Sequence, residues 1–135
     1  MPMADEIDKL TAFLPRLAAE DFSPIREWKG GERTDSGTIT LPWPDYDPAV
    51  RDFFEAAAAP CWTHSNYLSA GAEDMLADEE RARNASLDEI RAMLTFCVRG
   101  ERFCDGHWEA VIKAGHIERL LRRVGELRDA GVIGR

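Results

Sequence analysis

The strongest constraint on the fold is a helical repeat of apolar residues in the second half of the chain. Apolar side chains recur at helical spacing from Ile90 to Val98 and again from Ile117 to Leu127, so each set lies on one face of an expected helix. Ser86-Leu87-Asp88-Glu89 forms a capping box before the first helix, because its serine and glutamate side chains can satisfy backbone donors there. Gly100 is expected to end that helix, and Gly115 fits a left-handed turn before the second. These signals predict a helical core.

The rest of the chain carries further helix signals. Residues 5–19 have an apolar stripe at helical spacing, and Pro15 is expected to kink this helix or to end it near Leu14. Asp47-Pro48 predicts another helix start, with the aspartate as N-cap and the proline in the first turn. Asp105 is expected to be the N-cap of a short helix that precedes Gly115.

One β-structure is predicted between the first two helices. Residues 25–28 lead into a Gly-Gly pair, and residues 38–41 are a largely β-branched run. We therefore expect a two-stranded hairpin near residues 25–41. Pro42 and Pro44 are expected to close its second strand, because proline cannot donate to a hydrogen-bond ladder.

Together these elements predict a mostly α (α+β) fold, with five or six helices and the hairpin in one domain over residues 1–135. A chain of 135 residues is long enough to bury a core. Residues 71–85 are predicted to form an exposed acidic helix or a mobile segment, anchored by Met75 and Leu76. Residues 129–135 are expected to be a flexible tail.

Composition indicates a soluble globular protein, with 44% hydrophobic and 31% charged residues. No apolar run approaches the roughly 20 residues that a membrane-spanning helix needs. The acidic start lacks the basic flank and the apolar stretch of a signal peptide. We therefore expect a cytoplasmic protein that does not bind a membrane. The 3 cysteines are too few for a disulfide framework and are expected to be reduced thiols.

The net charge of −8 is unevenly distributed along the chain. Residues 1–85 hold 8 Lys and Arg against 17 Asp and Glu, whereas residues 86–135 hold 9 against 8. Because the larger part should repel polyanions, we do not expect a nucleic-acid partner. A weak helix-turn-helix DNA-binding protein is nevertheless an alternative, with Arg119, Arg122 and Arg123 on the helix that follows the turn.

The junction Arg99–Trp108, with the sequence RGERFCDGHW, is the candidate functional site. Charged, aromatic, cysteine and histidine side chains gather there between two helices. Loops held by a rigid scaffold are where binding and catalytic groups concentrate. Glu101, Asp105 and His107 could act as acid and base groups, although Asp105 would also serve simply as a helix cap.

The arginines of this junction have two interpretations. As structural groups, Arg99 and Arg102 would hold the loop to the carbonyls at the end of the preceding helix. As binding groups, they would hold an acidic ligand while Phe103 supplies an apolar contact. Trp43 and Tyr46 either line the same site or cover the core. The candidate binding residues are therefore Arg99, Glu101, Arg102, Phe103, Asp105, Trp43 and Tyr46.

A metal site is a further alternative. Cys61-x-x-His64 and Cys104-x-x-His107 together offer the four nitrogen and sulfur ligands of tetrahedral zinc. Such mixed pairs arise easily by chance, and Cys97 lies on an apolar helix face, as a small hydrophobic residue does. We therefore expect no metal and no cofactor.

Two stretches resemble a known family. The segment Leu41 to Tyr46 enters a helix, and a later helix ends in Arg-Gly-Glu-Arg-Phe-Cys-Asp-Gly, residues 99–106, before a pair of apolar helices. This order of elements is similar to that of short bacterial proteins grouped as domain of unknown function 6508, over most of residues 1–128. The resemblance implies no activity. It implies a common framework that includes Arg99, Glu101, Arg102, Phe103 and Gly106, and that excludes Cys61, His64 and His107.

The sequence favours a non-catalytic binding or protein-interaction module over an enzyme. Its ligand or protein partner is unknown, and a homodimer is a possible assembly. The alternative is a small enzyme that uses the acid and base groups of the 99–107 loop. The two differ in geometry, because an enzyme would have Arg99 and Arg102 converge with Glu101 on an open pocket.

Overall fold

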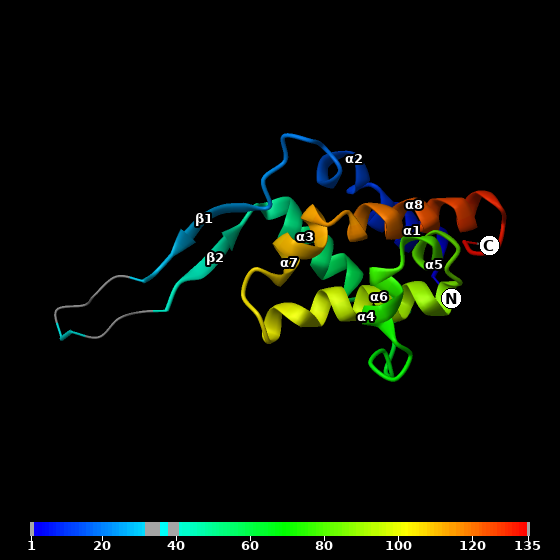
Figure 1. Cartoon of the computed structure of the whole chain (residues 1–135). Coiled ribbons are helices and arrows are strands. Elements are labelled where there is room, and N and C mark those ends of the chain that lie inside the picture. The colour runs from blue at the N-terminus through cyan, green and yellow to red at the C-terminus, as the bar shows by residue number, and fades with distance from the viewer. Residues whose placement is uncertain (1, 32–35, 38–40, 135) are drawn as a thin grey trace.

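The computed structural model describes residues 2–31, 36–37 and 41–134. Over these residues the chain is a mostly helical single domain, from which a two-stranded antiparallel hairpin projects (Figure 1). Five of the described helices have seven residues or more: α1 (Ala4–Thr11), α3 (Pro48–Ala57), α6 (Leu87–Arg99), α7 (His107–Lys113) and α8 (His116–Asp129). The predicted fold class is confirmed.

The helix predicted over residues 5–19 is divided into two. α1 is followed by α2 (Leu14–Leu17), and Pro15 lies in the first turn of α2. A proline there removes no helical hydrogen bond, because the first amides of a helix have no partner within it. Ile7 and Leu10 of α1 are buried, and α1 packs against α3 and α8.

The hairpin consists of β1 (Ile25–Lys29) and β2 (Trp43–Tyr46). Residues 38–40, which belong to the predicted second strand, lie outside the described residues. The prediction that Pro44 closes that strand is wrong, because Pro44 lies within β2 opposite Trp28. Both strands of a two-stranded ribbon are edge strands, where proline is tolerated.

Asp45 holds the base of the hairpin against α3. Asp45 is 8% exposed, and its Oδ1 accepts a hydrogen bond of 2.8 Å from Arg51 of α3. Its Oδ2 accepts one of 3.3 Å from Arg26 and lies 3.7 Å from the Lys29 ammonium. A carboxylate that is removed from water is stable only when such cations surround it. The direction of the hairpin is therefore set at its base.

The predicted helix start at Asp47 is confirmed. Asp47 Oδ1 accepts a 2.8 Å hydrogen bond from the Ala49 amide, and Pro48 occupies the first turn of α3. The short 3-10 helix η1 (Pro60–Trp62) follows α3, and Trp62 is only 1% exposed. This arrangement places α3 between the hairpin and the buried indole of Trp62.

Residues 71–85 contain two short helices, α4 (Ala72–Ala77) and α5 (Glu79–Arg83). The acidic side chains of these helices are exposed, whereas their buried side chains are Ala72, Met75, Leu76 and Ala82. Near the C-terminus, within the segment predicted to be a flexible tail, Ile133 is 2% exposed.

α6 and α8 pack against each other, and the core around them also takes buried side chains from α1, α3, α4 and α7. The capping box of α6 is confirmed, since Ser86 Oγ accepts from the Glu89 amide at 3.2 Å and Glu89 Oε1 accepts from the Ser86 amide at 3.0 Å. The 3-10 helix η2 (Gly100–Arg102) continues directly from α6. Gly115 has the expected positive φ of 81° between α7 and α8. No helix of the described part combines the length and apolar character needed to cross a bilayer.

Candidate functional site

Glu101 is the centre of the junction between α6 and α7. Its Oε1 accepts hydrogen bonds from the Tyr46 hydroxyl at 2.7 Å and from the Trp108 amide at 2.8 Å. Its Oε2 accepts from the Gly106 amide at 2.9 Å. The two amides lie at the start of α7, where backbone donors lack helical partners and a negative charge is stabilised. Glu101 therefore caps α7 and ties it to the end of β2.

The prediction that Asp105 caps this helix is wrong. Gly106 is the residue before α7, and it has a left-handed φ of 90°. This turn directs the free amides toward Glu101, while Asp105 remains exposed to solvent. Asp105 is the nearest carboxylate before the start of α7 in sequence, but the cap is Glu101 of the preceding 3-10 helix η2.

Tyr46, Trp108 and Phe54 form an aromatic unit beside Glu101. Trp108 stacks on Phe54 with ring centroids 4.5 Å apart and planes 8° apart, and its centroid lies 5.2 Å from that of Tyr46. The Trp108 indole donates to the Val98 carbonyl at 3.1 Å. Burial raises the pKa of the Tyr46 hydroxyl, and the hydrogen bond to Glu101 adds to the rise. Tyr46 is therefore a neutral donor to Glu101.

The two arginines do not make the carbonyl contacts expected of them as structural groups. The Arg99 guanidinium lies 5.3 Å from the centroid of the Tyr67 ring, a cation–π contact. Within the described residues, neither Arg99 nor Arg102 donates to a carbonyl at the end of α6. The Gly100 carbonyl instead accepts from the amides of Phe103 and Cys104, at 3.1 and 3.0 Å.

Two adjoining hollows lie beside this junction and share Ala58, Val98 and Arg102. The larger, of about 460 Å³, is also lined by Arg51, Phe54, Glu55, Glu101 and Trp108. The smaller, of about 100 Å³, is also lined by Ala57, Thr63, Thr95 and Arg99. We call the two together the α3–α6 groove. The walls of the larger hollow are mainly apolar and aromatic, and arginine side chains line both hollows.

The structure brings together only some of the predicted site residues. Arg99, Glu101 and Arg102 line the groove, and Tyr46 lies directly behind Glu101. Phe103 is 82% exposed and Trp43, on the hairpin, is 46% exposed, and neither lines the groove. Sequence reasoning missed Arg51 and Phe54. Their spacing of three residues placed them on one side of the helix that Asp47 begins, but did not indicate a groove there.

His107 belongs to the packing of the junction. Its ring contacts Phe96 edge-on, with centroids 5.3 Å apart, and lies so close to Gly100 that a Cβ there would overlap it. Burial lowers the pKa of His107, and the negative charge of Glu101 opposes this in part. Its Nε2 is buried, and no described residue bonds to it. This setting favours a neutral imidazole.

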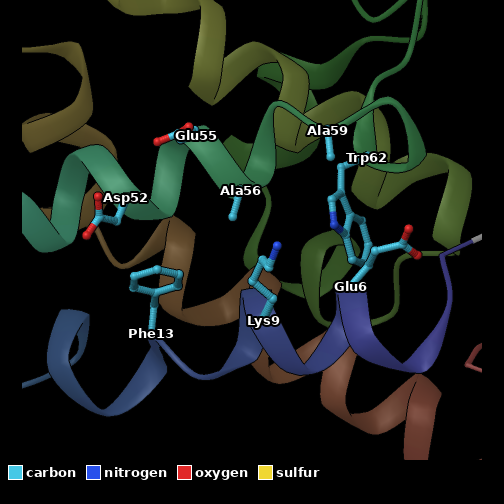
Figure 2. Close-up of a pocket in the computed structure, with 8 residues that line it drawn as sticks. All are labelled: Glu6, Lys9, Phe13, Asp52, Glu55, Ala56, Ala59 and Trp62. Carbon is cyan, nitrogen blue, oxygen red and sulfur yellow. The ribbon is translucent and has the colours of Figure 1, made fainter.

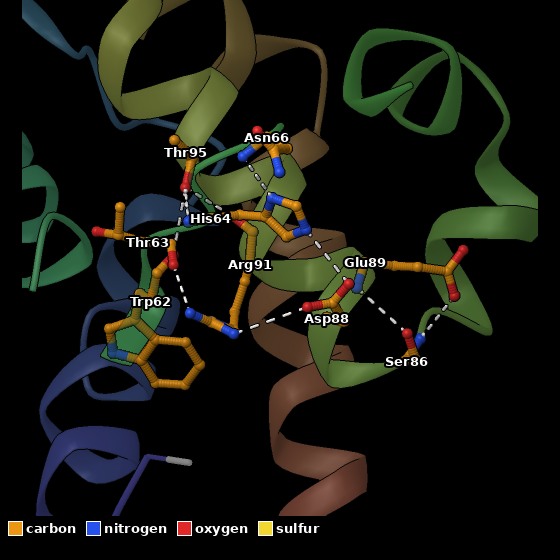
Figure 3. A network of polar contacts seen from close by, with 9 residues as sticks. All are labelled: Trp62, Thr63, His64, Asn66, Ser86, Asp88, Glu89, Arg91 and Thr95. Carbon is orange, nitrogen blue, oxygen red and sulfur yellow. Dashed lines mark hydrogen bonds and ion pairs between the residues drawn. The ribbon is translucent and has the colours of Figure 1, made fainter. Parts of the chain in front are cut away.

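His64, from the other predicted metal-ligand pair, is held in a network that joins residues 62–66 to α6 (Figure 3). Its Nδ1 accepts from the Asn66 amide at 3.1 Å, so Nε2 carries the hydrogen and donates to Asp88 at 3.3 Å. The His64 amide donates to Thr95 Oγ1 at 2.9 Å. Both ring nitrogens therefore have protein partners.

The cysteines do not gather with other metal-ligating side chains. Complete burial raises the pKa of the Cys97 thiol to about 12, and burial also raises that of Cys61. Cys104 is exposed. Within residues 2–31, 36–37 and 41–134, no group of three or more His, Cys, Asp or Glu side chains is placed to hold a metal ion.

The basic side chains of α8 are paired within the protein. Arg119 donates to the Ala114 carbonyl at 3.3 Å, and Arg123 donates to the Ala85 carbonyl at 2.9 Å. Arg122 donates to Glu118 at 3.0 Å. Only residues 114 and 115 separate α7 from α8, which is shorter than the usual turn of a helix-turn-helix motif.

The protein is a small helical domain with a projecting hairpin and an arginine-lined groove. The chain belongs to a family of unknown function, DUF6508, whose profile matches residues 2–130. The resemblance noted in the sequence is thereby confirmed. Comparison with curated proteins and with solved structures finds no match. The family assigns no activity, so a function has to be argued from the groove itself.

Proposed function

We propose that this protein is a non-catalytic binding module that holds an acidic group in the α3–α6 groove. The observation that carries the proposal is the position of Arg102, which lines both hollows of the groove. No described residue forms an ion pair with its guanidinium. A guanidinium binds a carboxylate or a phosphate through two parallel hydrogen bonds, which is the strongest common form of anion recognition in proteins.

The other arginines of the groove support an anionic ligand. Arg99 lies in the smaller hollow, where the Tyr67 ring holds its guanidinium from one side. Arg51 lies in the larger hollow, but its guanidinium is already bonded to Asp45. Arg102 is therefore the principal anchor, and the other two arginines raise the local positive potential.

The apolar lining indicates what accompanies the acidic group. The stacked rings of Phe54 and Trp108 and the side chains of Ala58 and Val98 form the floor of the larger hollow. Ligand pockets commonly combine such a floor with a few charged groups that fix orientation. The expected ligand is a carboxylate next to an aromatic or aliphatic group, as at the end of a peptide.

The catalytic alternative has less support from the same residues. Glu101 already accepts three hydrogen bonds from the protein, and releasing it would uncap α7. Asp105 does not line the groove, and His107 is packed against Phe96 and Gly100. The DNA-binding alternative is weakened by the internal pairing of Arg119, Arg122 and Arg123 on α8.

The test is a titration of ¹⁵N-labelled protein with N-acetyl-L-phenylalanine, followed through the Trp108 indole resonance. N-acetyl-L-phenylalanine amide, which lacks the charge, is the matched control ligand. We expect saturable binding of the acid, weakened about tenfold by R102A, which is the loss of one charge-assisted contact. R81A, which removes an exposed arginine of α5, should leave binding unchanged. Equal binding of acid and amide, or equal effects of R102A and R81A, would refute the proposal.

A further inference from the structure

We propose a second ligand site, between α1 and α3, that takes a small zwitterion with an ammonium group and a carboxylate on a short apolar body. The site is a pocket of about 430 Å³, within the size range of small-molecule sites. Figure 2 shows its walls: Glu6 and Lys9 come from α1, Asp52, Glu55 and Ala56 come from α3, and Trp62 lies at one end.

Trp62 provides the first pointer to a ligand. Its side chain is 1% exposed, yet Figure 2 shows its indole nitrogen on the side that faces the pocket. The contacts of Trp62 in the network of Figure 3 are made through its backbone carbonyl, and no described residue accepts from the indole. This N–H is not among the donors cut off from solvent, so water in the pocket can accept from it. A bound molecule that displaces this water would have to supply an acceptor in its place.

The charged side chains of the pocket provide the second pointer. Asp52 and Glu55 are three residues apart on the exposed side of α3, and Lys9 extends from α1 toward α3 near Ala56 (Figure 2). No described residue forms an ion pair with any of these three. Glu6 differs, because its Oε2 accepts from the Met3 amide at the start of α1. The pocket thus offers two carboxylates for an ammonium group, and a lysine and an indole N–H for a carboxylate.

The same residues argue against other ligand classes. A metal ion is disfavoured, because among the described residues these carboxylates do not converge with a third ligand. A simple anion would be repelled by three carboxylates around one ammonium group. A purely apolar molecule would cover Phe13, Ala56 and Ala59 but leave the indole N–H unpaired. A zwitterion with an apolar body matches all of the lining.

This site is separate from the α3–α6 groove except at Glu55, which borders both. The discriminating variants are therefore placed at Asp52 and Lys9, which line only the pocket. Asp5, an exposed acidic residue of α1 that does not line the pocket, supplies the matched control.

The experiment is a titration of ¹⁵N-labelled protein with L-phenylalanine, followed through the Trp62 indole resonance, which W62F identifies by its loss. Phenethylamine lacks the carboxylate of this probe, and 3-phenylpropionate lacks its ammonium group. We expect L-phenylalanine to shift the resonance saturably at concentrations up to about 20 mM, and each control compound to bind at least about fivefold more weakly. D52N and K9M should each weaken binding of L-phenylalanine about fivefold or more, whereas D5N should not.

Three results would overturn the proposal. The first is the absence of a saturable shift of the Trp62 resonance. The second is binding of either control compound as tight as that of L-phenylalanine. The third is binding by D52N equal to that by D5N. The variants D52N and K9M alter exposed residues, so their folding does not limit the test.

Discussion

Replacing Glu101 by alanine should destabilise the protein more than the loss of any exposed carboxylate. The substitution leaves the Tyr46 hydroxyl and the amides of Gly106 and Trp108 without their acceptor. Hydrogen bonds to a charged group contribute about 1.5–3 kcal/mol each, so three set an upper range of roughly 4.5–9 kcal/mol. Glu101 is half-buried, and water can reach part of the vacated site. We therefore expect a loss of about 2–3 kcal/mol in the free energy of unfolding.

The assay is urea unfolding followed by tryptophan fluorescence, with an unchanged dependence on denaturant as the sign that only stability has changed. Y46F removes one of the three donors to Glu101 and should cost about 1–1.5 kcal/mol. The double variant E101A/Y46F should show a coupling energy of at least about 1 kcal/mol between positions 46 and 101. E118A, which breaks the exposed pair with Arg122, should change stability by no more than about 0.5 kcal/mol. If E101A were as mild as E118A, the assignment of Glu101 as the cap of α7 would be refuted, and additivity with Y46F would refute its hydrogen bond with Tyr46.

Two further predictions concern the histidines. Gly100 has a helical φ of −59°, so alanine would be favourable there by backbone propensity, but its Cβ would overlap the His107 ring. We expect G100A to lower stability by about 1–3 kcal/mol and the additional change H107A to relieve part of the loss, as measured by thermal unfolding. Burial lowers the pKa of both His107 and His116 from the ordinary value of 6.5, so the unfolded chain binds more protons below that pH. The stability they contribute should therefore be lost as the pH falls from 7 to 5, and H116Q should flatten that dependence in urea titrations at both pH values.

Local signals in the sequence were sufficient for several helix boundaries. The capping box at Ser86 and the aspartate–proline start at Asp47 each involve residues no more than three positions apart, and both are confirmed. The energies that select them do not depend on the rest of the fold. The same is true of Gly115, whose left-handed conformation follows from the absence of a side chain.

The sequence was sufficient to predict where in the chain the candidate site lies, but not which residues come together to form it. Asp105 was the expected local cap of α7, whereas the cap is Glu101, which is also bonded to Tyr46, 55 positions away. That contact depends on how the hairpin meets α7, which no periodic pattern encodes. Arg51 and Phe54 were missed for a related reason. They become part of a groove only because α6 packs against α3.

The base of the hairpin is where its strands are connected to the helices. Asp45 and Tyr46 are the residues of β2 that connect to the helices, through Arg51 and Glu101 respectively. Farther out, Trp28 and Trp43 are about half exposed, at 50% and 46%. The Trp28 ring nevertheless lies beside Gly106 at the start of α7, where a Cβ would be 3.5 Å from it. Changes at Asp45, Tyr46 or Trp28 would therefore disturb the contact between the hairpin and the helices. Related proteins would then be expected to share one hairpin direction.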